Sequence, residues 1–109
     1  MKVSDAYVYI ADLISQAEAI LECREREERG DWAITAFSRF RIVELLGLSP
    51  STSYGGDLDA DPAALLEEAV RAVDQLVVPI GKLTWHRALA DALRCALADV
   101  RMVQRARHV

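Results

Sequence analysis

The chain has 109 residues, of which 52% are apolar and 6% aromatic, with only 5 glycines and 3 prolines. This composition excludes a disordered chain and favours helices. The net charge of −4 excludes nucleic-acid binding driven by the overall field of the molecule. Two distant cysteines, Cys23 and Cys95, form no metal-type pair and predict a reducing, cytoplasmic setting. No secretory signal pattern and no apolar run of about 18 residues is present, so we expect no membrane partner.

A first helix is predicted from about Asp5 to Arg29, with Ser4 as its N-cap. Its apolar residues recur at spacings of three and four: Ile10, Leu13, Ile14, Ala17, Ile20 and Leu21. Only Gly30 and Asp31 separate this helix from the next apolar stretch. Two helices joined so tightly must fold back on each other as an antiparallel αα-hairpin.

The second helix is predicted from Trp32 to Gly47, with Asp31 as its N-cap and Gly47 as a left-handed C-cap before Pro50. At 100° per residue, all three aromatic residues of the segment fall on one face, and we expect this face to line the core. Its members are Trp32, Ala33, Ala36, Phe37, Phe40 and Val43.

The opposite side of the second helix also carries apolar residues, Ile34, Ile42 and Leu45, interleaved with Thr35, Ser38 and Arg41. Two apolar stripes on one helix indicate burial from two sides or a surface for a partner. A neighbouring helix of the same chain could cover the second stripe. The residues of the predicted interface are Ile34, Arg41, Ile42 and Leu45.

The stretch from Leu48 to Ala60 is predicted to be one long loop, because Ser, Pro, Gly and Asp dominate it. A third helix follows, with Asp61 as its N-cap and Pro62 in its first position. The apolar stripe of this helix is Leu65, Leu66, Ala69, Val70, Val73, Leu76 and Val77. A fourth helix begins near Thr84, with the stripe Leu89, Leu93, Ala96, Leu97, Val100 and Val103. The predicted fold is therefore all-α: an antiparallel four-helix bundle of two αα-hairpins, with one long loop between the second and third helices and a single domain over 1–109.

The first hairpin resembles a single tetratricopeptide-type unit, with a small-residue turn at Gly30 followed by Ala36 and Phe37. The second half has neither the turn nor the spacing. One such unit is below the three repeats that a solenoid needs, so the resemblance implies no function.

The fourth helix carries a basic stripe, because steps of seven residues nearly repeat one helical face. Its members are Arg87, Arg94, Arg101 and Arg105. This stripe is either a solvated polar face or a surface for an anionic partner, such as a nucleic acid or phosphates. Acidic residues of the first helix, Glu18, Glu22 and Glu25, could also cover it.

The sequence assigns no catalytic, cofactor-binding or metal-binding residue. Asp57, Asp59, Asp61 and Glu68 have the spacing of calcium ligands, but Pro62 stands where the calcium loop needs Gly. His86 has no second ligand at helical spacing. Arg101 and His108 resemble, at a longer spacing, the Arg–His pair of HEPN-class ribonucleases, which implies a proton-moving His108.

The favoured function is a non-enzymatic protein–protein interaction module or accessory subunit that self-associates or docks on a larger partner. The double-striped second helix and the absence of a convergent polar site both favour this interpretation. The alternative is a helical protein that binds nucleic acid or phosphates through the arginines of the fourth helix, as in a prokaryotic defence or regulatory system. An enzyme is less favoured than either.

Overall fold

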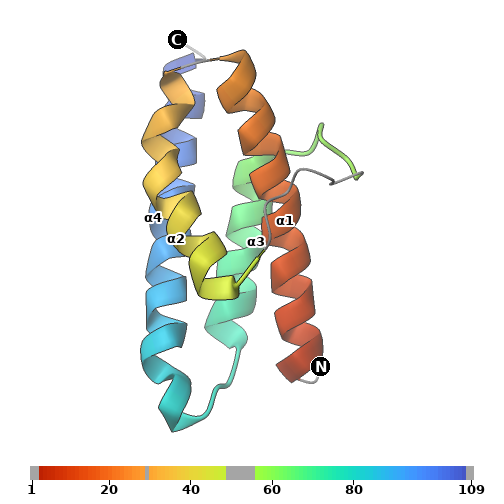
Figure 1. The fold of residues 1–109 in the computed structure, drawn as a ribbon, viewed down its shortest axis with the longest axis vertical. Helices are drawn as coiled ribbons and strands as arrows, with labels where there is room; N and C mark the ends of the chain where they lie inside the picture. The colour runs from red at the N-terminus through yellow and green to blue at the C-terminus, as the bar shows by residue number, and fades with distance from the viewer. Residues whose placement is uncertain (1–2, 29, 49–55, 108–109) are drawn as a thin grey trace.

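The computed structural model describes residues 3–28, 30–48 and 56–107. In these residues the chain forms four α-helices and two short 3₁₀ helices (Figure 1). The α-helices are α1 (Val3–Glu27), α2 (Ala36–Leu46), α3 (Pro62–Gln75) and α4 (Leu83–Arg107), and the 3₁₀ helices are η1 (Asp31–Thr35) and η2 (Ile80–Lys82). The predicted all-α fold is confirmed. None of the described helices combines the length and hydropathy that crossing a bilayer would require.

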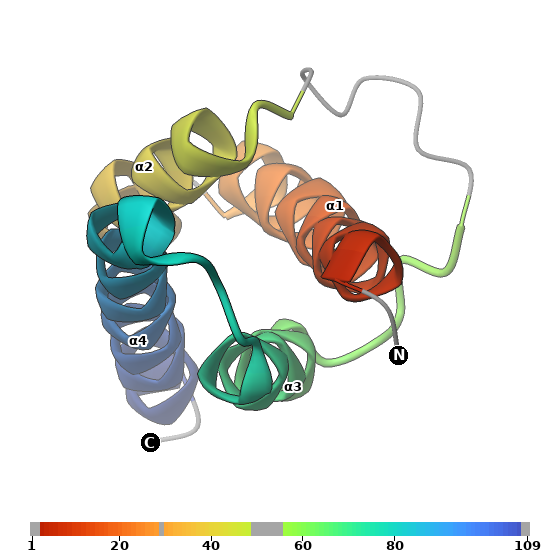
Figure 2. The ribbon, with the colours of Figure 1, turned by 90° about the horizontal axis from the view of Figure 1, so that it is seen from below.

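The four helices surround one apolar core (Figure 2). α1 packs on α3, α3 on α4, and α4 on α2, while α1 and α2 make much sparser contact. α1 and α4 run in one direction along the long axis and α2 and α3 in the other, so each helix is antiparallel to the neighbours it packs on. Residues 49–55 of the predicted loop lie outside the described residues.

In α1, α3 and α4 the apolar stripes predicted from the spacing face the core, apart from Val77, which lies beyond the end of α3 at Gln75 and is exposed. The core contains, from α1, α3 and α4, Ile10, Ile14, Ala17, Leu21, Leu66, Ala69, Val73, Leu89, Leu93, Ala96 and Val100. Each large aliphatic side chain buried in this way stabilises the fold by about 1.5–3 kcal/mol relative to full exposure.

Two predicted helix ends are confirmed by their capping bonds. The Asp61 carboxylate accepts a hydrogen bond from the Ala63 N–H at 3.1 Å, and Pro62 occupies the first turn of α3. At the end of α2, Gly47 has a φ of 65°, and the Leu48 N–H donates to the Val43 carbonyl at 3.0 Å. This left-handed glycine satisfies carbonyls of the last turn, as the sequence predicts.

The predicted start of the second helix is wrong. Residues Asp31–Thr35 form the 3₁₀ helix η1, and Asp31 lies inside it rather than capping an α-helix. Gly30, with a φ of 92°, makes the turn out of α1. Residues three apart eclipse each other in a 3₁₀ helix, so Trp32 and Thr35 point the same way, into the core. A continuous α-helix would instead have grouped Trp32 with Phe37 and Phe40.

The predicted core face of α2 is therefore wrong as well. Phe37 and Phe40 are 83% and 72% exposed, and Ala33 and Ala36 are also exposed. The residues of η1 and α2 that point inward are Trp32, Thr35, Ser38, Arg39, Ile42 and Leu46. Three of these six are polar, which is why the hydrophobic pattern assigned the opposite face to the core.

We expect Phe40→Ala to change the free energy of unfolding by no more than about 0.5 kcal/mol, because the ring is mostly exposed and its loss leaves no cavity. A core phenylalanine would cost about 3–5 kcal/mol. Urea unfolding followed by tryptophan fluorescence, at protein concentrations below about 1 µM so that association does not contribute, measures this difference. A loss above about 2 kcal/mol would place the ring in the core after all.

Candidate functional site: the outer face of α2

Of the four residues of the predicted interface, two are exposed and two are buried or partly buried. Ile34 is 52% exposed and Arg41 is exposed, so both are on the surface. Ile42 is 1% exposed and Leu45 packs partly buried against the core. Ile42 is thus unavailable to a partner of the folded chain, because α2 turns the side opposite to the predicted one toward the core.

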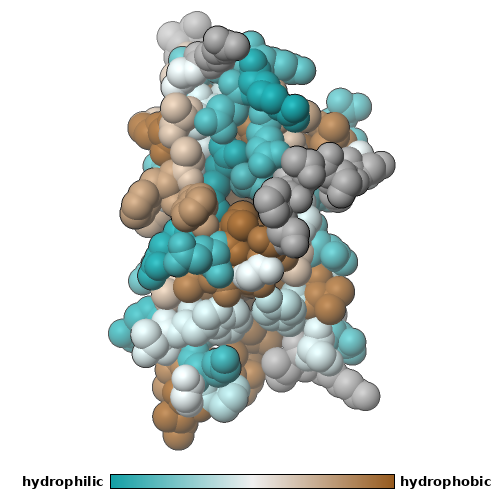
Figure 3. Space-filling view, in the orientation of Figure 1, coloured by the Kyte–Doolittle hydropathy of each residue, from teal (hydrophilic) through white to brown (hydrophobic). Residues whose placement is uncertain are grey.

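The outward side of α2 and η1 carries the two phenylalanines that the sequence interpretation placed inside. We call the α2 surface the set Ile34, Phe37, Phe40, Arg41 and Glu44, all of which are exposed. Arg41 and Glu44 form a loose ion pair, 3.9 Å between nitrogen and oxygen. Figure 3 shows apolar colour along the edge formed by α2, and again at the lower end of the molecule near the α3–α4 connection.

A buried arginine holds α2 in this orientation. The side chain of Arg39 is only 6% exposed. Its guanidinium donates two hydrogen bonds of 2.9 Å to Glu18 and one of 2.9 Å to Glu25, both on α1. A fourth bond reaches the Thr35 hydroxyl at 3.1 Å. A guanidinium buried with this many partners fixes the rotation of α2 about its own axis.

Burial alone would lower the pKa of Arg39, but the hydrogen bonds and negative charges of Glu18 and Glu25 outweigh it and raise that pKa above its ordinary value. Arg39 is therefore charged at every physiological pH. The signal that could have revealed this arrangement is the spacing of Glu18 and Glu25. Seven residues apart, they lie on one face of α1, two turns from each other.

Further hydrogen bonds hold η1 and α2 in place. In η1, which precedes α2, the Trp32 indole N–H donates to Glu28, just past the end of α1, at 2.6 Å. The Ser38 hydroxyl donates to Asp99 of α4 at 3.5 Å. At the end, the Trp85 indole N–H donates to the Leu45 carbonyl at 2.8 Å. The α2 surface is thus displayed by a helix that is anchored entirely through its other side.

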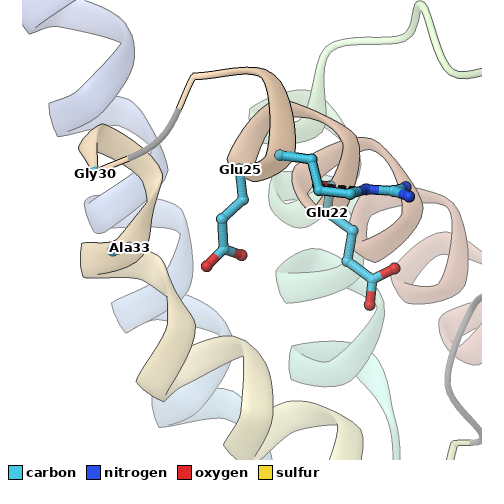
Figure 4. A pocket seen from close by; sticks show the side chains of 5 residues that line it. Glu22, Glu25, Gly30 and Ala33 are labelled. Carbon is cyan, nitrogen blue, oxygen red and sulfur yellow. Dashed lines mark hydrogen bonds between the residues drawn. The ribbon is translucent and has the colours of Figure 1, made fainter.

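A groove of about 760 Å³ lies between α1 and η1, where the two helices make few contacts (Figure 4). Its lining residues are Glu22, Glu25, Arg26, Gly30 and Ala33. Figure 4 shows Glu25 reaching from α1 into the space beside η1. Ala33 belongs both to this groove and to the exposed side of η1, so the groove borders the α2 surface.

The predicted basic stripe is partly neutralised within the chain. Arg94 pairs with both carboxylate oxygens of Asp74 at 2.7 Å, and Arg101 pairs with Glu67 at 2.6 Å. The acids that cover these two arginines belong to α3, and not to α1 as considered from the sequence. Within the described part of the chain, Arg87 and Arg105 have no acidic partner within ion-pair distance.

We expect Arg94→Ala to lower the free energy of unfolding by less than about 1 kcal/mol, because the Arg94–Asp74 pair is about half exposed and solvent screens it. The melting temperature at low and high salt measures the effect, which should be smaller in high salt. A loss above about 2 kcal/mol would mean that this pair anchors α4 to α3.

The remaining candidates from the sequence do not come together as sites. Asp61 caps α3, and Glu68 accepts a hydrogen bond of 2.5 Å from the Tyr9 hydroxyl. Among the described residues, no group of three or more His, Cys, Asp or Glu side chains is placed to hold a metal ion. His86 Nε2–H donates to the Val73 carbonyl at 2.6 Å, and His108 lies outside the described residues.

The chain matches no protein-family model, and neither the curated proteins nor the solved structures include a significant match to it.

Proposed function

We propose that this chain is a protein–protein interaction module that contacts its partner through the α2 surface, without catalysing a reaction. The observation that supports this most is the exposure of Phe37 and Phe40 on a helix that is anchored by other residues. Aromatic side chains are enriched at the centres of protein interfaces, where they account for much of the binding energy.

The rigidity of the helix also supports a binding role. Arg39 joins α2 to α1 through its bonds to Glu18 and Glu25, and the Trp85 indole of α4 bonds the Leu45 carbonyl of α2. The helix that carries the two rings is therefore oriented before a partner binds. A surface that is already ordered loses less conformational entropy on binding.

The nucleic-acid alternative has weaker support. Two of the four arginines in the stripe are engaged by acidic residues of α3, and the chain as a whole is acidic. The remaining Arg87 and Arg105 lie at opposite ends of α4. Two separated cations provide little of the phosphate neutralisation on which nucleic-acid affinity depends.

We also propose that the protein works in a reducing compartment such as the cytoplasm. Both cysteines are free thiols, and Cys95 is exposed on α4. Exposed thiols of this kind persist where the cell keeps thiols reduced.

A photo-activated crosslinker tests the proposal. A benzophenone side chain placed at position 37 should give a discrete protein adduct in cells of the native host. The same group at position 64, which is exposed on α3, is the matched control and should give none. Adding Phe40→Glu should abolish the adduct from position 37. Equal labelling from positions 37 and 64, or no discrete adduct from position 37, would overturn the proposal.

A further inference from the structure

We propose that the partner on the α2 surface is a second copy of this chain, arranged about a two-fold axis that runs perpendicular to α2 beside Phe40. This inference rests on the proposed function, because it names the occupant of the same surface. The area of the surface, its local charge and the spacing of its residues support a second copy as the occupant.

The exposed apolar area is about half of what one partner buries in an ordinary interface. A phenylalanine has about 150–250 Å² to bury, so the two rings leave roughly 300 Å² uncovered, and half-exposed Ile34 brings the total to roughly 400 Å². An ordinary interface buries about 800 Å² on each partner. A second α2 lying along this one would also cover the exposed Ala33 and Ala36 and the rim of the groove, which adds to the contact.

The α2 surface is locally neutral and so does not repel a second copy, although the molecule as a whole is acidic. The chain carries a net charge of −4, so two copies repel each other over most of their surfaces. The outer side of α2 carries one positive residue, Arg41, and one negative residue, Glu44. The α2 surface is therefore neutral where two copies would meet. Arg41 of each copy can pair with Glu44 of the other.

The spacing of the residues is self-complementary in an antiparallel pairing. With the axis beside Phe40, Phe37 lies about 4.5 Å along the helix from the partner's Phe40, since three residues rise by that length. Both rings of each copy then contact rings of the other. Arg41 lies about 7.5 Å along the helix from the partner's Glu44, which is within the joint reach of the two side chains.

Light scattering after size exclusion tests the pairing. At about 50 µM the wild type should have twice the chain mass of 12.1 kDa. Phe40→Glu should raise the dimer dissociation constant at least tenfold, because it places two carboxylates beside the axis. The matched control is Val77→Glu, which changes an equally exposed apolar residue (81%) just beyond α3 and should leave the dimer intact.

A charge exchange tests the cross-subunit ion pairs. Arg41→Glu should weaken the dimer, since each copy then presents glutamates at both positions to the other. Combining it with Glu44→Arg restores opposite charges across the axis and should recover the wild-type dissociation constant. Thermal melting of each variant confirms that the fold is kept.

The outcomes separate this inference from the proposed function. A monomer at about 50 µM whose position 37 still crosslinks to another protein overturns the dimer and leaves the interaction module standing. A dimer that survives Phe40→Glu but is lost in Val77→Glu also overturns the inference, because it places the contact at the α3–α4 connection. A monomer without any adduct from position 37 overturns both.

Discussion

Trp32→Ala should lower the free energy of unfolding by about 3–5 kcal/mol, the largest loss that we expect from one substitution in this chain. Trp32 has no exposed surface, and it is the largest fully buried side chain of the core. Its removal leaves a cavity between η1, α1 and α4 that the stiff surrounding helices cannot close. At about 4 °C per kcal/mol for a chain of this size, the melting temperature should fall by about 15 °C.

Two further variants make this expectation specific. Trp32→Phe keeps most of the volume but loses the bond to Glu28, so it should cost about 1–2 kcal/mol. Trp85→Phe, at a partly buried position, should cost a similar amount, because it loses the bond to the Leu45 carbonyl. Thermal melts followed by circular dichroism compare all three. A Trp32→Ala loss no larger than that of Trp85→Phe would contradict the buried position of Trp32.

Arg39→Ala should cost about 3 kcal/mol, because it leaves the carboxylates of Glu18 and Glu25, two turns apart on one face of α1, at the α1–α2 contact without their shared cation. The expected loss is set at the lower end of the range for a broken buried ion pair, because the Glu25 side chain is partly exposed and remains solvated. The loss is measured by urea unfolding under the conditions used for Phe40→Ala.

A double variant separates the cost of a broken ion pair from the value of an intact one. Arg39→Met combined with Glu18→Leu removes the buried guanidinium together with its nearest carboxylate and replaces both with apolar side chains. Such replacements are often neutral or stabilising, so most of the loss should be recovered. The surface control is Arg71→Ala, whose ion pairs with Glu67 and Glu68 are exposed and should be worth less than about 1 kcal/mol. Equal losses from Arg39→Ala and Arg71→Ala would show that Arg39 is not a structural clamp.

The sequence predicts three of the four helices well because their inward faces are apolar throughout. The stripes of α1, α3 and α4 therefore need only helical periodicity to be found. The cap at Asp61 and the left-handed Gly47 follow from local backbone chemistry. These features depend on residues that are close in the sequence, and so they can be read from it.

The orientation of α2 could not be predicted in this way. The inward position of Arg39 depends on two glutamates of another helix, Glu18 and Glu25, and hydropathy assigns an arginine to solvent. The 3₁₀ conformation of η1 adds a second difficulty. Because a 3₁₀ helix has three residues per turn, the direction of Trp32 relative to the residues of α2 differs from the direction that a continuous α-helix would give. The candidate site was therefore placed on the right helix but partly on its wrong side.

In η1 and α2, the residues that hold the fold together and the residues that form the exposed surface are different ones, and this affects how the sequence can evolve. Its folding depends on Trp32, Arg39 and Ile42, which point inward, while the positions of Phe37 and Phe40 point outward. Mutations at the outward positions can therefore change this surface while the fold is retained. Under the proposed function, a lineage could exchange its partner through a few substitutions at these positions without first passing through an unstable protein.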